Sequence, residues 1–131
     1  MAQVLLAEDD NAVRDFVRRA LELNAHHVAI AHDGGEACHL ITSGTRKFDL
    51  LISDIKMPVM DGITLALIAA EKVPDMPILL MTGYADQRER AYGLEAIIAG
   101  LLYKPFTLED ITAAVDKALV SNSAQSFGLD T

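Results

Sequence analysis

The chain has 131 residues, of which 51% are hydrophobic, and it carries a net charge of −8 from 19 acidic and 11 basic side chains. This length and apolar content suffice for one folded core, and the lack of a long apolar run or a basic leader predicts a cytoplasmic domain without a membrane span. The acidic balance disfavours direct binding to nucleic acid, because a negative surface repels phosphate backbones.

In the first half of the chain, short apolar runs alternate with helical patterns. The apolar runs predict strands at 4–7, 28–31 and 48–53. Between the first two, residues 11–24 space their apolar side chains as a helix does. A second, shorter helix is expected over 35–42, where Gly34-Gly35 is interpreted as a turn or helix-start signal.

The second half continues the alternation and ends in a polar stretch. Its expected elements are a helix at 62–72, a strand at 77–81, a helix from 86 to about 92, a strand at 101–103 and a helix from 107 to about 120. Thr107, followed three residues later by Asp110, has the pattern of a capping box at the start of the last helix. The small and polar residues from Ser121 onward predict a flexible tail, so the domain is expected at 1–120 and the tail at 121–131.

This alternation of strands and helices predicts an α/β fold with a parallel sheet that is covered on both faces. Such sheets bind their ligands at the carboxyl ends of the strands. Polar side chains follow four of the predicted strands at this end: Glu8, Asp9 and Asp10 after the first, Asp54 after the third, Thr82 after the fourth and Lys104 after the fifth. Each one alone is ordinary as a helix cap, a turn residue or a strand end, but together they predict a site.

The acids of this set constrain the chemistry of the site. Carboxylates that converge repel one another, so either one of them takes up a proton or a divalent cation neutralises them. Oxygen ligands without nearby Cys or His favour Mg²⁺, with Mn²⁺ as the alternative. Because Mg²⁺ is commonly bound together with phosphate, Thr82 and Lys104 are interpreted as donors to a phosphoryl group that passes to the Asp54 carboxylate.

Four segments carry a resemblance to a known family: LLAEDDNAVR, LLISDIKMPVMDG, ILLMTGYAD and LLYKPF, in this order. Over about residues 3–120 the chain resembles the receiver domain of response regulators, the phosphoacceptor of two-component and phosphorelay signalling. The resemblance implies a flavodoxin-like, doubly wound sheet of five parallel strands in the order 2-1-3-4-5, with five helices.

The resemblance also implies a role for each site residue. Asp54 is the expected phosphoryl acceptor, Thr82 donates to a phosphoryl oxygen, and Lys104 pairs with the phosphate. The expected Mg²⁺ ligands are Glu8, Asp9, Asp54 and the backbone carbonyl of Lys56. The bond between Lys104 and Pro105 corresponds to one that is usually cis in the family, and the sequence does not settle its isomer in this chain.

The sequence departs from the family pattern near the fifth strand. Leu101 stands where an aromatic residue is common, and Ile97-Ile98 replace the usual Gly-Ala turn. We therefore expect phosphorylation to be read out mainly through residues 82–93 rather than through Leu101.

The favoured interpretation is a stand-alone switch, monomeric or weakly dimeric, that is not an enzyme beyond its own phosphorylation and dephosphorylation. It takes the phosphoryl group from a sensor histidine kinase or a histidine phosphotransfer protein, and then binds a protein partner or passes the group on. A phosphatase of the haloacid dehalogenase type is one alternative, but it needs an acid where Lys56 stands. A pseudo-receiver is the other, although it is expected to lack a site residue, and none is missing.

Overall fold

Five parallel strands form one sheet in the predicted order β2-β1-β3-β4-β5. A computed structural model describes residues 1–83, 91 and 93–128 of the chain, with side chains up to residue 120. The strands are β1 (Gln3–Ala7), β2 (His27–Ala31), β3 (Leu50–Asp54), β4 (Ile78–Thr82) and β5 (Gly100–Tyr103). The α/β class and the doubly wound topology expected from the sequence are therefore confirmed.

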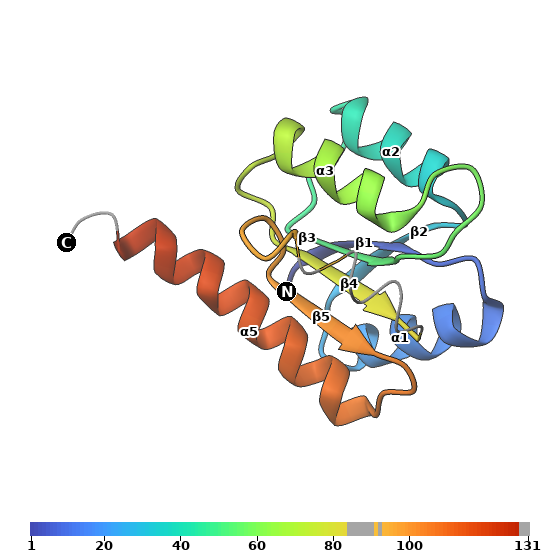
Figure 1. Cartoon of the computed structure of the whole chain (residues 1–131). Coiled ribbons are helices and arrows are strands. Elements are labelled where there is room, and N and C mark those ends of the chain that lie inside the picture. Colours follow the sequence, from blue (N-terminus) through green and yellow to red (C-terminus); the bar gives the residue numbers. More distant parts are fainter. Residues whose placement is uncertain (84–90, 92, 129–131) are drawn as a thin grey trace.

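Helices cover both faces of the sheet, as Figure 1 shows. On one face lie α1 (Asn11–Leu23) and α5 (Leu108–Gly128), and on the other lie α2 (Gly34–Thr42) and α3 (Gly62–Lys72). The helix expected from 86 to about 92 falls almost wholly on residues 84–90 and 92, which lie outside the described part of the chain. The described residues thus contain four of the five expected helices.

Successive side chains along each strand pack alternately into the two apolar layers that lie between the sheet and the helices. Leu51 of β3 packs in the layer beneath α2 and α3, whereas its neighbour Ile52 packs against α1 and α5. Val17 of α1 and Val115 of α5 are buried in this second layer. Because both faces are covered, the central strands are apolar throughout, which is why they appear in the sequence as short apolar runs.

Side-chain caps begin the helices directly after the strands. The Asp10 carboxylate accepts hydrogen bonds from the amides of Ala12 and Val13 at 2.9 and 3.1 Å, and so caps α1. The predicted capping box of α5 is confirmed, since the Asp110 amide donates to Thr107 Oγ1 at 3.0 Å and the Thr107 amide donates to Asp110 Oδ2 at 2.9 Å. These caps fix the points at which the chain leaves the carboxyl edge of the sheet.

The boundaries of the four described helices agree with the prediction to within one residue, except at the end of the last one. Helix α3 has the predicted bounds, but α5 continues to Gly128, eight residues beyond the end expected at Val120. The expected tail is therefore helical over 121–128. The bond between Lys104 and Pro105, whose isomer the sequence did not settle, is cis.

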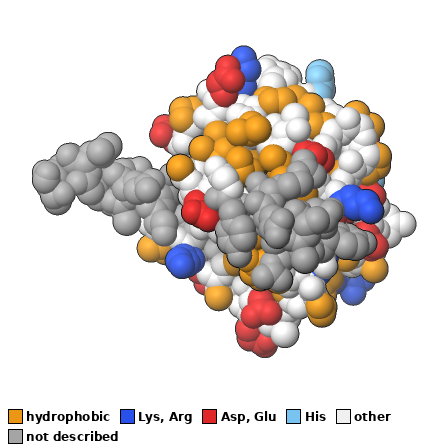
Figure 2. Space-filling model, in the orientation of Figure 1, with side chains coloured by type: hydrophobic (Ala, Val, Ile, Leu, Met, Phe, Trp, Pro, Cys, Tyr) orange, Lys and Arg blue, Asp and Glu red, His pale blue; other side chains and the backbone are white. Residues whose placement is uncertain are grey.

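Some apolar side chains are exposed on the surface over α3. Figure 2 shows hydrophobic side chains gathered over this helix, and Leu67 is 51% exposed there. Isolated apolar side chains on a surface are ordinary and by themselves indicate no site.

None of the helices in the described part of the chain combines the length and the apolar character needed to cross a membrane.

Candidate functional site

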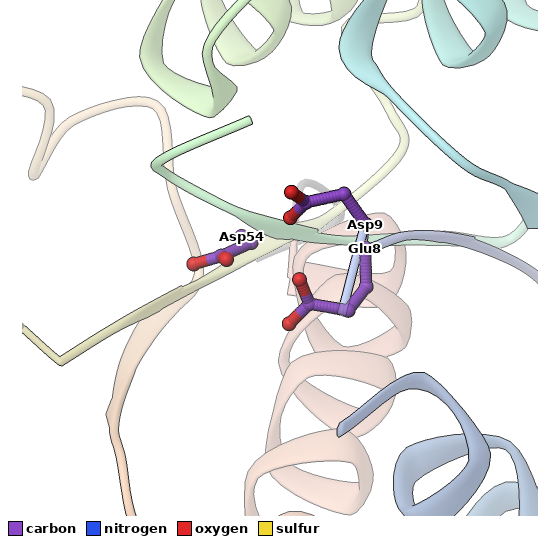
Figure 3. A group of neighbouring side chains, drawn as sticks. All are labelled: Glu8, Asp9 and Asp54. Carbon is purple, nitrogen blue, oxygen red and sulfur yellow. The ribbon is translucent and has the colours of Figure 1, made fainter. Parts of the chain in front are cut away.

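The predicted acids do converge at the carboxyl edge of the sheet. Ala7 of β1 is paired in register with Ser53 of β3, so the residues that follow them, Glu8 and Asp54, lie next to each other. One carboxylate oxygen from each of Glu8, Asp9 and Asp54 lies within 4.8 Å of the other two. Figure 3 shows the side chains of Glu8 and Asp9 pointing toward the side on which Asp54 lies. The parallel topology thus brings together acids that are 45 positions apart in the sequence.

These three acids differ in their exposure to solvent. Glu8 is fully buried and Asp54 is 6% exposed, whereas Asp9 is exposed. Two acids are thus held in a poorly solvated place, where ionised carboxylates require a compensating positive charge.

Lys104 supplies a positive charge to the cluster, although strand β4 lies between its own strand and that of Asp54. It follows β5, and its side chain reaches past β4, so that Nζ lies 3.0 Å from Asp54 Oδ2 and 3.1 Å from Glu8 Oε1. The Lys104 amide also donates to the carbonyl of Thr82 at 2.8 Å, which fixes the backbone from which the side chain extends. One ammonium against three carboxylates still leaves the cluster negative.

The pKa values of both Glu8 and Lys104 are raised in this cluster. Burial, together with the negative charge of Asp54, raises the pKa of Glu8 from 4.5 to about 7, although the attraction of Lys104 opposes this rise. Burial lowers the pKa of Lys104, but its hydrogen bonds and attraction to Asp54, with the attraction of Glu8, outweigh burial and raise it overall. Lys104 is therefore firmly protonated at neutral pH, while Glu8 titrates there in the metal-free protein.

The donor set fits a hard divalent cation. All three side chains offer carboxylate oxygens, and the residual negative charge of the cluster favours binding of a positive ion. Lys56 lies two residues beyond Asp54, in a loop whose neighbouring side chains, Ile55 and Met57, are buried. Its backbone is thus held close to the acids, while its side chain is exposed.

Thr82 completes the set of predicted site residues. It is buried at the end of β4, one residue beyond Met81, which is the register partner of Asp54. The structure therefore places Glu8, Asp9, Asp54 and Lys104 in one cluster, with Thr82 at the end of the adjacent strand.

Two glycines hold the loop after Asp54, and sequence reasoning missed the role of Gly34. A Cβ on Gly34 would overlap with the carbonyl oxygen of Met60, and a Cβ on Gly62 would overlap with the carbonyl oxygen of Asp54. The pair Gly34-Gly35 is the only sequence signal at this position, and such a pair indicates a turn or the start of a helix rather than a close contact with a distant loop. The close approach to Met60 depends on the packing of two segments that are distant in the sequence.

Comparison with known proteins agrees with this geometry. The family model described as the response regulator receiver domain matches residues 4–116. The chain belongs to this family. Among curated relatives, "Response regulator MprA" of Mycobacterium avium (strain 104) and of Mycobacterium tuberculosis (strain ATCC 25618 / H37Rv) are each 39% identical over 111 residues, which is 85% of this chain. The match covers 48% and 47% of those proteins, so the receiver domain spans about half the length of the curated relatives it matches.

Solved structures share the receiver fold over nearly the whole chain. A CheY-like receiver domain protein from Methanospirillum hungatei JF-1 has a TM-score of 0.85 at 28% identity, covering 95% of this chain and 98% of that one. The chemotaxis response regulator CheY4 of Vibrio cholerae has a TM-score of 0.79 at 30% identity, covering 91% and 99%. A receiver domain protein from Clostridium thermocellum, at 22% identity and a TM-score of 0.85, covers 95% and 99% and shows the likeness of fold alone.

Membership in the family sets the general role of the chain. It is a receiver domain of two-component signalling, a family whose members are generally not catalytic enzymes, and its acidic cluster can hold a metal ion. The role of each individual residue is the subject of the proposal below.

Proposed function

We propose that this receiver domain takes a phosphoryl group from a phosphohistidine onto the Asp54 carboxylate, and that the phosphorylated form signals to a protein partner. The expected donors are a sensor histidine kinase or a histidine phosphotransfer protein. Glu8, Asp9, Asp54 and the Lys56 carbonyl would hold Mg²⁺, or Mn²⁺ in its place. When bound, the cation neutralises charge on the acids and on the phosphoryl oxygens.

In the transfer, a carboxylate oxygen of Asp54 forms a bond to phosphorus while the bond from phosphorus to the histidine nitrogen breaks. The imidazole leaves with that electron pair, and Asp54 becomes an acyl phosphate. Lys104 already neutralises Asp54, and it would move its contact from Oδ2 to the phosphoryl oxygens. Thr82, at the end of the adjacent strand, would donate its hydroxyl to the same group. The protein thus contributes positioning and charge compensation, and the reactive phosphoryl group comes from the donor.

The contact of Lys104 with both Asp54 and Glu8, beside Asp9, is the observation that supports this proposal most directly. A cation, Lys104, and two further acids, Glu8 and Asp9, thus surround one buried carboxylate, an arrangement that a phosphoryl acceptor needs and a helix cap does not. The exposed Lys56 stands where a haloacid dehalogenase phosphatase needs an acid, which argues against that alternative. A net charge of −8 favours a protein partner over nucleic acid.

The test is chemical phosphorylation of the purified chain. We expect acetyl phosphate or phosphoramidate, with Mg²⁺, to add one phosphoryl group that is stable to acid and labile to base, as an acyl phosphate is. Phosphoramidate matters because it carries the nitrogen–phosphorus bond of the proposed donor. Asp54→Asn should remove the labelling, and chelation of the metal should strongly reduce it.

Asp75→Asn is the matched control, because Asp75 is an exposed acid outside the cluster and its loss should leave labelling unchanged. Labelling of Asp54→Asn to the wild-type level, or full labelling of the wild type in EDTA, would contradict the assignment of the acceptor or of the cation.

A further inference from the structure

The loop between β3 and α3 contains a turn of unusual backbone geometry. Val59 has a φ of +72°, in the left-handed region that β-branched residues rarely adopt. The amide of Met60 donates to the carbonyl of Pro58 at 2.8 Å, which closes a three-residue γ-turn around Val59. The Val59 side chain is 83% exposed, so its own burial does not compensate for this conformation. A strained turn of this kind persists only where the surrounding structure holds it.

The beginning of α2 lies directly against this turn. A Cβ on Gly34 would overlap with the carbonyl oxygen of Met60 and would lie 2.9 Å from the Met60 Cβ. A Cβ on Gly35 would lie 2.7 Å from Cγ1 of Val59. Gly34 therefore lies against the backbone of the turn, where only glycine allows so close an approach. Gly35 lies against the Val59 side chain, which would have to shift to admit a Cβ.

The same loop is attached to the acceptor strand at its other end. The Gly62 amide donates to the carbonyl of Ile55 at 2.7 Å, and a Cβ on Gly62 would overlap with the carbonyl oxygen of Asp54. Lys56 lies between the buried Ile55 and the turn. Because the loop is short and fixed at both ends, a shift of the turn is transmitted to the backbone of Lys56 and Asp54.

We propose that Gly34 and Gly35 are positioning residues for Mg²⁺ binding and phosphoryl transfer. They hold the strained turn around Val59 against α2, and in this way they set the place of the Lys56 carbonyl and the Asp54 carboxylate. Neither glycine touches the reacting atoms. The inference rests on the proposed function, because it assigns the Lys56 carbonyl to the metal.

The two glycines can be separated by their different contacts. Alanine in the first turn of a helix favours the helix over glycine, so Gly34→Ala and Gly35→Ala are not expected to weaken α2 itself. The methyl group in Gly35→Ala meets only the side chain of Val59, so Val59→Gly should make room for it. The methyl group in Gly34→Ala meets a backbone carbonyl, and no truncation of Val59 relieves that overlap.

The experiment measures Mg²⁺ dissociation constants by titration for Gly34→Ala, Gly35→Ala, Val59→Gly and the two double variants. Since a displacement of about 1 Å can cost a large factor in a positioned site, we expect a weakening of at least roughly threefold for Gly35→Ala and roughly tenfold for Gly34→Ala. The double variant of Gly35→Ala and Val59→Gly should have the same Mg²⁺ dissociation constant as Val59→Gly alone. The double variant of Gly34→Ala and Val59→Gly should still bind Mg²⁺ as weakly as Gly34→Ala does. Gly100→Ala is the matched control, because its methyl group meets only the end of the Leu79 side chain, at 3.1 Å, and it should bind Mg²⁺ as the wild type does.

A second readout uses the metal-free protein. The amide and carbonyl chemical shifts of Asp54 and Lys56 should differ from the wild type in Gly35→Ala. They should return to the values of Val59→Gly in the double variant that also carries that change. If Gly35 served only the structure of α2, neither effect would be expected. Wild-type shifts and wild-type Mg²⁺ affinity in Gly35→Ala, or a failure of Val59→Gly to rescue it, would overturn the inference even if Gly34→Ala does not fold. A wild type that neither binds Mg²⁺ nor accepts phosphate would instead overturn the proposed function, and the metal-free shifts would still decide whether α2 holds the loop.

Discussion

Removing the charge of Glu8 should stabilise the metal-free receiver domain at neutral and higher pH. Glu8 is fully buried, and its pKa in the folded protein is about 7 instead of 4.5. One pKa unit corresponds to roughly 1.4 kcal/mol, so ionising Glu8 in the folded state costs about 3 kcal/mol of stability relative to an exposed carboxyl group. Glu8→Gln keeps the size and a hydrogen-bonding oxygen for Lys104 but removes the charge that burial and Asp54 disfavour.

The sign and the pH window follow from the raised pKa. The folded protein holds a proton on Glu8 more tightly than the unfolded chain does, so this group favours folding below about pH 4.5. The advantage is lost as the pH rises through 7, and above that the wild type carries the full penalty. We expect Glu8→Gln to exceed the wild type in free energy of unfolding by up to about 3 kcal/mol at pH 8, and by little at pH 4.5.

Urea denaturation in EDTA across pH 4.5 to 8 measures this difference directly, because other titrating groups cancel between the two proteins. Glu71→Gln, an exposed acid on α3, is the control and should follow the wild type at every pH. A gap between Glu8→Gln and the wild type that does not change with pH would refute the assignment of the penalty to the ionised Glu8.

Two further predictions concern the cation and the loop. Mg²⁺ should raise the free energy of unfolding of the wild type by about 1–3 kcal/mol at concentrations roughly 10 to 100 times the dissociation constant. Asp9→Asn should lose this gain, and an equal gain in that variant would show that Asp9 is not a ligand. Gly62→Ala should lower the free energy of unfolding by more than about 2 kcal/mol, because its methyl group overlaps with the backbone oxygen of Asp54 and neither group can move without shifting the chain. Chemical denaturation measures both effects, and a Gly62→Ala protein as stable as Gly100→Ala would contradict the close approach.

Much of the site was predictable because a parallel sheet brings the carboxyl ends of its strands to one edge. The apolar runs before Glu8 and Asp54 predicted two strands of a parallel sheet, the resemblance predicted that they are neighbours, and the structure places these acids side by side. Helix α3 was predicted with correct bounds, with Pro74 as its stop signal, and the structure adds that Asp61 caps its start. The roles of Asp54, Thr82 and Lys104 in phosphoryl transfer stay predictions until they are tested as described.

What the sequence did not reveal depends on distances across the fold or on weak local signals. The contact of Lys104 with Glu8 requires a side chain to reach past a whole strand, which no local pattern encodes. Helix α5 was expected to end at Val120 because the apolar spacing stops there, yet no Gly or Pro stands between that residue and Gly128 to end it. The predicted readout through residues 82–93 stays a prediction, because 84–90 and 92 lie outside the described residues.

The length of α5 has a mechanical consequence. Its first three turns are anchored in the core through Ile111, Val115 and Ala118, whereas Figure 1 shows its last turns extending beyond the sheet. At 1.5 Å per residue, the 21 residues of the helix span roughly 30 Å. The part beyond Ala118, residues 119–128, is roughly 15 Å long, so a rotation of about 10° of the anchored turns would move the far end by roughly 3 Å. A helix of this shape would act as a lever arm, because a small repacking beside β5 would be enlarged at its free end.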